Sequence, residues 1–206
     1  MIEVNSVRFS YLRNGHIVLN DCSASFRSQG LFLIKGTNGS GKSTFLDVVT
    51  GFKMPLSGTV IINGINVYKN NNSLKAISRI VSYMPASLRF PNTLTVSYIL
   101  QHYSGPHFFG ELCKVLGLEE FKDKKYSELS DGYKTRLALS ICLSKGAYIF
   151  LDEPLKSQDE DLKRIFPQIL NKYTAGRSVV VCSPQAIQGI DWNNCYELRN
   201  GRLAEC

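Results

Sequence analysis

The sequence has no apolar stretch close to the ~20 residues that a transmembrane helix needs. Its start, Met1-Ile2-Glu3-Val4, lacks the basic and then apolar segment of a signal peptide. We therefore expect a chain that does not itself span a bilayer. Its six cysteines show no C-x-x-C spacing, and its three histidines are not clustered. These absences favour reduced, buried thiols in a cytosolic protein.

Basic residues are in excess but scattered along the chain. The formal net charge is +7, yet no basic block is longer than Lys122-Asp123-Lys124-Lys125, so the sequence predicts no binding of nucleic acid. A positive surface suits a protein that handles nucleotides or one that lies against an anionic membrane, and the charge alone does not choose between them. With 206 residues and no internal repeat, the chain suits one domain.

What the sequence does contain is a phosphate-binding loop. Residues 36–44 match G-x-x-x-x-G-K-S/T with no mismatch, between an apolar run of strand length at 31–34 and a helical pattern at 44–50. The glycines let successive N–H groups converge on an anion, and the helix N-terminus adds positive charge. We expect Lys42 to reach the β- and γ-phosphates of a triphosphate and the Ser43 hydroxyl to hold Mg²⁺. The predicted nucleotide-binding residues are Gly36, Thr37, Asn38, Gly39, Ser40, Gly41, Lys42, Ser43 and Thr44.

The segments around this loop predict an antiparallel sheet. Residues 2–9 alternate as a strand, and residues 17–19 and 22–26 suggest a second and a third. Residues 59–67 read as a hairpin with an Asn-Gly turn, residues 70–72 as a loop and residues 80–83 as a further strand.

The second half of the chain alternates helices and buried strands. Residues 87–129 predict a small helical insertion, and a helix runs from Asp131 until Lys145-Gly146. The runs at 147–151 and 179–182 are unbroken apolar segments, which is typical of parallel strands buried on both faces. A helix with its apolar face at 162–170 must be kinked or divided by Pro167, and residues 195–203 close the chain with a hairpin. The fold class is therefore α/β with a mainly parallel sheet.

Asp152 and Glu153 follow the apolar run at 147–151 directly. A carboxylate at the end of a buried parallel strand faces a neighbouring phosphate loop, where a nucleotide-bound Mg²⁺ requires it. We expect Asp152 to bind that ion together with Ser43. Glu153 would orient or deprotonate a water in line with the γ-phosphate.

Residues 129–132, Leu-Ser-Asp-Gly, begin the helix that leads into this strand. The order of phosphate loop, helical insertion, this helix start and then Asp-Glu resembles that of the ABC-transporter ATPases of the single-domain bacterial type, and residues 129–132 resemble their signature motif. The resemblance implies a P-loop NTPase fold with a mainly parallel core sheet, an N-terminal antiparallel β-subdomain and a small helical insertion. It divides one ABC ATPase domain, 1–206, into a β-subdomain (1–30 and 56–70), a helical subdomain (87–130) and a RecA-like core.

The same resemblance implies roles for single residues. Tyr11 matches the aromatic residue that stacks on adenine, and residues 157–159 fall at the family's D-loop, where only Asp159 agrees well. Glu153, Lys42 and Asp152 would be catalytic, with ATP and Mg²⁺ as cofactors. Family members pair head to tail, so the signature residues would face the γ-phosphate held by a second ATPase subunit, identical or different; these residues are Ser130, Asp131 and Gly132.

Three positions depart from the family's pattern. A glutamine position is Ala86, a histidine position is Pro184, and the closing glutamine of the signature is Tyr133. In one interpretation, which we favour, the chain hydrolyses ATP slowly, with Ser183 or Gln185 bonding in place of the histidine. In the other, it is a catalytically weakened subunit that binds ATP and regulates a partner.

Other ATPase classes lack support in the sequence. It contains no Asn-Lys-x-Asp motif of a GTPase, no heptad repeat of a DNA-repair ATPase and no second phosphate loop. The resemblance implies a stand-alone subunit on the cytoplasmic face of the membrane, attached through a transmembrane permease subunit, and the compact build favours an exporter. A helix of that permease would enter a groove beside the insertion, for which the candidate residues are Phe90, Pro91, Leu94, Tyr98, Phe108 and Phe109.

Overall fold

The computed structural model describes all residues of the chain except 13–14, 105–108 and 157. Its strands are β1 (Ile2–Ser10), β2 (Ile17–Phe26), β3 (Gly30–Lys35), β4 (Ser57–Ile62), β5 (Ile65–Asn66), β6 (Val81–Met84), β7 (Tyr148–Asp152), β8 (Ser178–Ser183), β9 (Asn194–Arg199) and β10 (Arg202–Glu205). Its helices are α1 (Lys42–Val49), α2 (Asn71–Ile80), α3 (Val96–Tyr103), α4 (Phe109–Val115), α5 (Asp131–Leu143) and α6 (Glu160–Tyr173). Two 3₁₀ turns, Glu119–Phe121 and Tyr126–Glu128, lie between α4 and α5.

The strands form two sheets. One is antiparallel, in the order β2-β1-β4-β5, and the other has the order β10-β9-β3-β8-β7-β6. In the second sheet β9, β3, β8, β7 and β6 run parallel, and β10 pairs antiparallel with β9. This confirms the expected α/β class with a mainly parallel sheet and an antiparallel N-terminal sheet.

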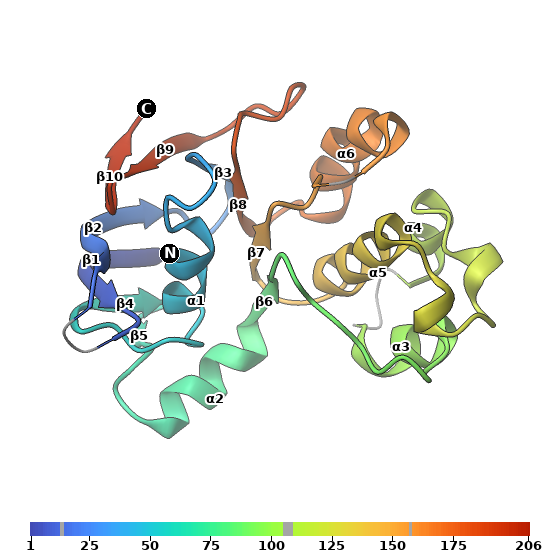
Figure 1. The fold of residues 1–206 in the computed structure, drawn as a ribbon, viewed down its shortest axis with the longest axis horizontal. Coiled ribbons are helices and arrows are strands. Elements are labelled where there is room, and N and C mark those ends of the chain that lie inside the picture. The colour runs from blue at the N-terminus through green and yellow to red at the C-terminus, as the bar shows by residue number, and fades with distance from the viewer. Residues whose placement is uncertain (13–14, 105–108, 157) are drawn as a thin grey trace.

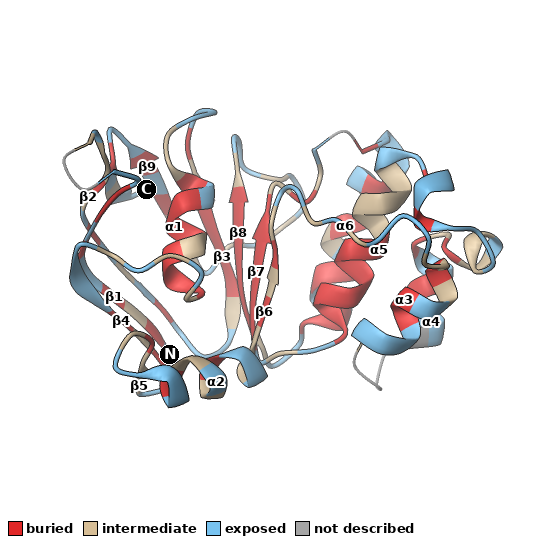
Figure 2. Ribbon diagram, turned by 60° about the horizontal axis from the view of Figure 1, so that its bottom comes forward, coloured by how far each residue is buried: buried red, intermediate tan, exposed pale blue. Residues whose placement is uncertain are grey.

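The parallel sheet is buried on both faces because its central strands carry unbroken apolar runs, at 148–151 in β7 and 179–182 in β8. Along β8, Val180 and Cys182 belong to one apolar cluster, and Val179 and Val181 belong to the other. The first cluster also contains α1 and the antiparallel sheet, so α1 lies between the two sheets (Figure 1). The second contains α3, α5 and α6 (Figure 2). The carboxyl ends of β3, β7 and β8 therefore meet at one edge, beside α1.

Three expectations about elements are wrong. Residues 17–26 form one strand instead of two, because β1 pairs with β2 across a register shift and Asp21 takes a left-handed φ of 61°. Residues 71–80 are a helix, whose first turn is capped by the Asn70 side chain accepting the Ser73 N–H. Of the two outcomes expected at Pro167, a kink or a division, the division is wrong, since α6 is continuous from 160 to 173.

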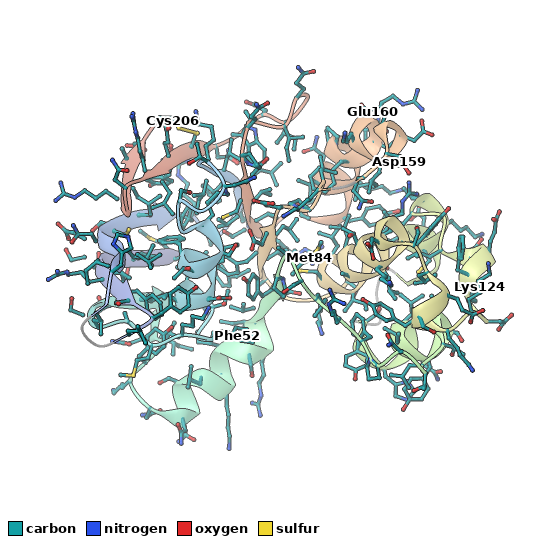
Figure 3. All side chains as sticks on the ribbon, viewed as in Figure 1. Phe52, Met84, Lys124, Asp159, Glu160 and Cys206 are labelled. Atoms are coloured by element: carbon teal, nitrogen blue, oxygen red, sulfur yellow. A yellow bond between two sulfur atoms is a disulfide. The ribbon has the colours of Figure 1, made fainter. Side chains whose placement is uncertain are left out.

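Four cysteines are free and buried, as expected, namely Cys22, Cys113, Cys142 and Cys182. The expectation of reduced thiols is wrong for the other two, since Cys195 and Cys206 form a disulfide (Figure 3). The antiparallel pairing of β9 with β10 brings the Cα atoms of Cys195 and Cys206 to 5.3 Å from each other. Within the described residues, no helix combines the length and apolarity needed to cross a membrane.

Candidate functional site

The loop between β3 and α1 has the backbone conformation of a phosphate cradle. Gly39 and Gly41 have φ of 82° and 104°, in the left-handed region that favours glycine. A Cβ on Gly36 would lie 2.5 Å from Ser40 Oγ and 2.7 Å from the Leu198 carbonyl oxygen. Glycine is therefore required at these positions for the chain to turn into α1.

Lys42, the first residue of α1, points back into this loop. Its side chain is 4% exposed, and its ammonium donates to the carbonyl oxygens of Gly36 at 2.8 Å and Thr37 at 3.1 Å. It also lies 3.6 Å from Glu153 Oε1. A buried cation held by the loop carbonyls is positioned to contact an anion bound in the loop.

Asp152 ends β7 beside the loop and is 1% exposed. No described group completes a hydrogen bond to either carboxylate oxygen. Burial raises the pKa of Asp152, and the nearby Ser43 hydroxyl partly opposes this effect. A buried carboxylate with unsatisfied oxygens next to a hydroxyl is a hard-oxygen donor set, which fits Mg²⁺.

Glu153 follows in a left-handed conformation, with φ of 49°. This conformation costs a non-glycine residue roughly 1–2 kcal/mol, and here the Glu153 N–H donates to the Cys182 carbonyl at 2.9 Å. The carboxylate lies between two lysines, with Lys42 Nζ 3.6 Å from Oε1 and Lys156 Nζ 3.3 Å from Oε2. Because Glu153 is left-handed, the chain turns after β7, so Glu153 lies in the cleft while Asp152 remains in the sheet.

Tyr11 lies at the other end of the same cleft. Its hydroxyl shares a hydrogen bond of 2.8 Å with Thr44 Oγ1 and accepts one from Lys53 Nζ at 3.3 Å. Its ring packs edge-on against Phe9 and is 60% exposed. One face is covered by Lys53 Nζ, 4.8 Å from the centroid. The ring is therefore held in place and can still receive a planar ligand.

A cleft of about 490 Å³ joins these groups. Its described lining residues are Tyr11, Val18, Asn38, Gly39, Gly41, Lys42, Ser43, Thr44, Ala86, Glu153 and Lys156. Lys156 was not singled out from the sequence, although its position three residues after Glu153, in a turn, was a usable signal. Ala86 contributes only a methyl group, and Pro184 is exposed just after β8.

Ser130, Asp131 and Gly132 do not line this cleft. Ser130 caps α5 by accepting the Tyr133 N–H at 3.4 Å, and both Ser130 and Asp131 are exposed. A Cβ on Gly132 would make only ordinary contacts, the nearest at 3.8 Å. Ser130 and Asp131 are thus exposed at the start of α5, outside the loop cleft, while Asp131 also lines a neighbouring cavity with Asp152 and Glu153.

Asp159 caps α6 by accepting the Leu162 N–H at 2.8 Å (Figure 3). Its second oxygen accepts from Arg136 of α5 at 2.5 Å. The backbone hydrogen bond from Leu162, together with the Arg136 charge, lowers the pKa of Asp159. Asp159 therefore ties the residues after Glu153 to the helix that starts at Ser130; Ser157 lies outside the described residues.

A phosphate loop, a buried carboxylate with unsatisfied oxygens and a glutamate at one edge of a parallel sheet define a P-loop nucleoside triphosphatase fold. Residues 19–156 match the family model for the ABC transporter. The chain belongs to this family and is the ATP-binding subunit of an ABC transporter.

Relatives and solved structures agree with this assignment. The chain is 34% identical over 197 residues to the putative ABC transporter ATP-binding protein PH0132 of Pyrococcus horikoshii, covering 88% of this chain and 73% of the relative. It is 32% identical over 183 residues to the cytochrome c biogenesis ATP-binding export protein CcmA of Reclinomonas americana, covering 84% and 80%. Its fold matches the ATP-binding cassette MJ0796 bound to ADP and Pi, with a TM-score of 0.83, 22% identity and coverage of 100% and 98%.

Proposed function

We propose that this subunit hydrolyses Mg-ATP between two ATPase subunits paired head to tail, and thereby drives a separate transmembrane subunit. The observation that carries the proposal is that Lys42 and Glu153 line one cleft 3.6 Å apart, with the buried Asp152 carboxylate beside Ser43 and Lys42 at its edge. The triphosphate would lie along residues 36–44, with adenine on the exposed ring of Tyr11.

Each group in the cleft has a chemical task in this proposal. Lys42 leaves the loop carbonyls for the β- and γ-phosphates. Ser43 and Asp152 would hold Mg²⁺, which neutralises charge on the phosphates. Glu153 accepts a hydrogen bond from the attacking water and orients it, or takes its proton.

The second half of the site would come from the other subunit. Ser130 and Asp131 are exposed and Gly132 is half-buried, and all three lie outside the loop cleft of their own chain. The Ser130 hydroxyl and the N-terminus of the 13-residue helix α5 suit a γ-phosphate presented by a partner. That partner is either a second copy of this chain or a different ATPase subunit.

The membrane connection would run through a transmembrane permease subunit, with the ATPase peripheral on the cytoplasmic face. A cleft of about 450 Å³ between β6, α2 and the insertion contains Phe90 and Pro91 but neither Leu94 nor Tyr98. Of the other candidates, Phe108 lies outside the described residues and the Phe109 side chain is not described. We propose Phe90 and Pro91 as contacts for a permease helix, with residues 87–130 as the helical subdomain, 1–30 and 56–70 as the β-subdomain and the remainder as the core.

The short helical insertion favours an exporter. The named relatives include both an export protein and the taurine import ATP-binding protein TauB of Roseobacter denitrificans, which is 30% identical over 171 residues, covering 75% of this chain and 59% of the relative. Transport measured in vesicles containing the permease and this subunit distinguishes the two directions.

The test of the enzyme proposal is ATP hydrolysis by the purified protein, alone and with its permease. Lys42→Ala should weaken nucleotide binding and turnover, while Glu153→Gln should keep ATP binding and lose turnover. Binding of Mg-ATP without turnover under either condition would reject hydrolysis.

A second candidate function, an ATP-binding regulatory subunit, is favoured by Ala86 and Pro184. Losing one transition-state contact typically costs ~10²–10³ in rate, and both positions lack a polar side chain. The double change Ala86→Gln with Pro184→His should raise turnover if these positions limit it. Unchanged turnover would show that other residues supply the missing contacts.

A further inference from the structure

The Glu153 carboxylate has a second cation beside it. Lys156 Nζ lies 3.3 Å from Oε2, while Lys42 Nζ lies 3.6 Å from Oε1. The backbone places Lys156 there, because its N–H donates to the Glu153 carbonyl at 3.0 Å and closes a turn. The turn begins at the left-handed Glu153. The backbone turn thus holds Lys156 beside Glu153, unlike a surface lysine whose position no turn fixes.

The two lysines differ in what else holds them. Lys42 is buried and bound to the Gly36 and Thr37 carbonyls. The side chain of Lys156 is 64% exposed, and the ion pair with Glu153 is the polar contact that the described residues show for its ammonium. Lys156 borders both the loop cleft and a neighbouring cavity of about 540 Å³ beside the insertion. It can therefore follow the Glu153 carboxylate when ligand enters.

Nucleotide binding changes the surroundings of Glu153. In the proposed function, on which this inference rests, Lys42 turns to the phosphates, and the negative phosphates then repel the carboxylate. Among the described residues that line the loop cleft, Lys42 and Lys156 are the cations. The neighbouring cavity that Glu153 also lines adds Arg89 and Lys134, but the ion pairs that the described residues show for Glu153 are those with Lys42 and Lys156. Lys156 is thus the partner left to keep Glu153 in the cleft.

We propose that Lys156 is a positioning residue for ATP hydrolysis, which holds the Glu153 carboxylate toward the attacking water once Lys42 has engaged the phosphates. It acts through Glu153, without itself touching the reacting atoms. Because the Lys156 side chain is largely exposed, the solvent-screened pair contributes modestly, and we expect an effect of about three- to fivefold on rate.

The experiment compares kcat and KM for ATP in the wild-type protein, Lys156→Met and Lys156→Arg, assayed with the permease. Lys156→Met should lower kcat about three- to fivefold and leave KM within about twofold, and Lys156→Arg should restore about half of the rate or more. The matched control is Lys163→Met, which breaks another lysine–glutamate pair three residues apart, at 2.6 Å on α6. It should leave both constants unchanged.

A double variant tests whether Lys156 affects kcat through Glu153. In a Glu153→Gln background, Lys156→Met should cause no further loss of residual turnover, because the carboxylate that it holds is gone. An additional loss there, a change confined to KM, or an unchanged kcat in Lys156→Met would overturn the inference and leave the proposed function standing. A wild-type protein that binds Mg-ATP without hydrolysing it would overturn both.

Discussion

Replacing Asp152 by asparagine should make the nucleotide-free protein more stable and remove its response to Mg²⁺. Asp152 is 1% exposed, and neither of its carboxylate oxygens has a hydrogen-bond partner among the described residues. An unsatisfied buried polar group costs about 1–3 kcal/mol, and a charged one costs more, so removing the charge relieves only part of this cost. Because asparagine has the same shape without the charge, we expect the free energy of unfolding to rise by about 1–2 kcal/mol and Tm by roughly 2–8 °C.

The higher free energy of unfolding of Asp152→Asn should depend on pH. Burial raises the pKa of Asp152 above its ordinary value of 3.8, which the unfolded chain keeps. Between that value and the raised folded pKa the folded protein binds more protons, so its free energy of unfolding falls as the pH rises. Below pH 3.8 the group is protonated in both states. The advantage of Asp152→Asn should therefore vanish in acid and reach its full size above the folded pKa.

The assay is calorimetry of both proteins across this pH range, with and without Mg²⁺ and a non-hydrolysable ATP analogue. At a ligand concentration 100 times Kd, the wild-type protein should gain about 2.7 kcal/mol, and Asp152→Asn should lose the Mg²⁺-dependent part of this gain. Asp47→Asn is the control, since Asp47 accepts from Tyr83 at 3.0 Å and Lys53 at 2.6 Å, and its Tm should fall. A lower Tm for Asp152→Asn with an intact Mg²⁺ response would refute the reasoning.

Three further predictions concern the adenine platform, the exposed helix start and the proline in α6. Tyr11→Ala should weaken ATP binding about tenfold by removing a stacking surface, while Tyr11→Phe should stay within about twofold; equal losses in a fluorescence titration would argue against stacking. In a Glu153→Gln background, Gly132→Asp should abolish the ATP-dependent pairing of two subunits, because the added carboxylate repels the γ-phosphate; light scattering measures this pairing. Gly132→Ala should fold normally, because its Cβ makes only ordinary contacts, the nearest at 3.8 Å. Pro167→Ala should raise Tm by several degrees, because proline inside a helix costs about 3 kcal/mol relative to alanine and α6 is unbroken; an unchanged Tm would mean that local packing offsets this cost.

Much of the fold could be predicted because it follows from contiguous patterns. The phosphate loop at 36–44 is a single stretch whose own backbone forms the cradle, so its glycines and Lys42 are recognisable without knowing the rest of the structure. The apolar runs that became β7 and β8 could be assigned to a buried parallel sheet because every position is apolar.

The secondary structure of polar or irregular segments was predicted wrongly. The helix Asn71–Ile80 has only Ser73 and Ile77 buried, and its opening asparagines are typical of a loop as well as of a cap. Residues 17–19 and 22–26 were predicted as two strands, but pairing with β1 carries β2 through Asn20 and Asp21. In both cases neighbouring elements decided between conformations that the local residues allow equally.

The sequence by itself determined which residues have the chemistry for nucleotide binding and the order in which they occur. Only the tertiary structure decided which of them meet. It brings Lys42 to 3.6 Å from Glu153, 111 positions further along the chain, and places Lys156 beside the other oxygen of that carboxylate. It also joins Cys195 to Cys206 and leaves Ser130 exposed, outside the loop cleft of its own chain. The physical reason is that a loop or an apolar strand depends on neighbours along the chain, whereas these meetings depend on strand order and register, which are set by packing between distant segments.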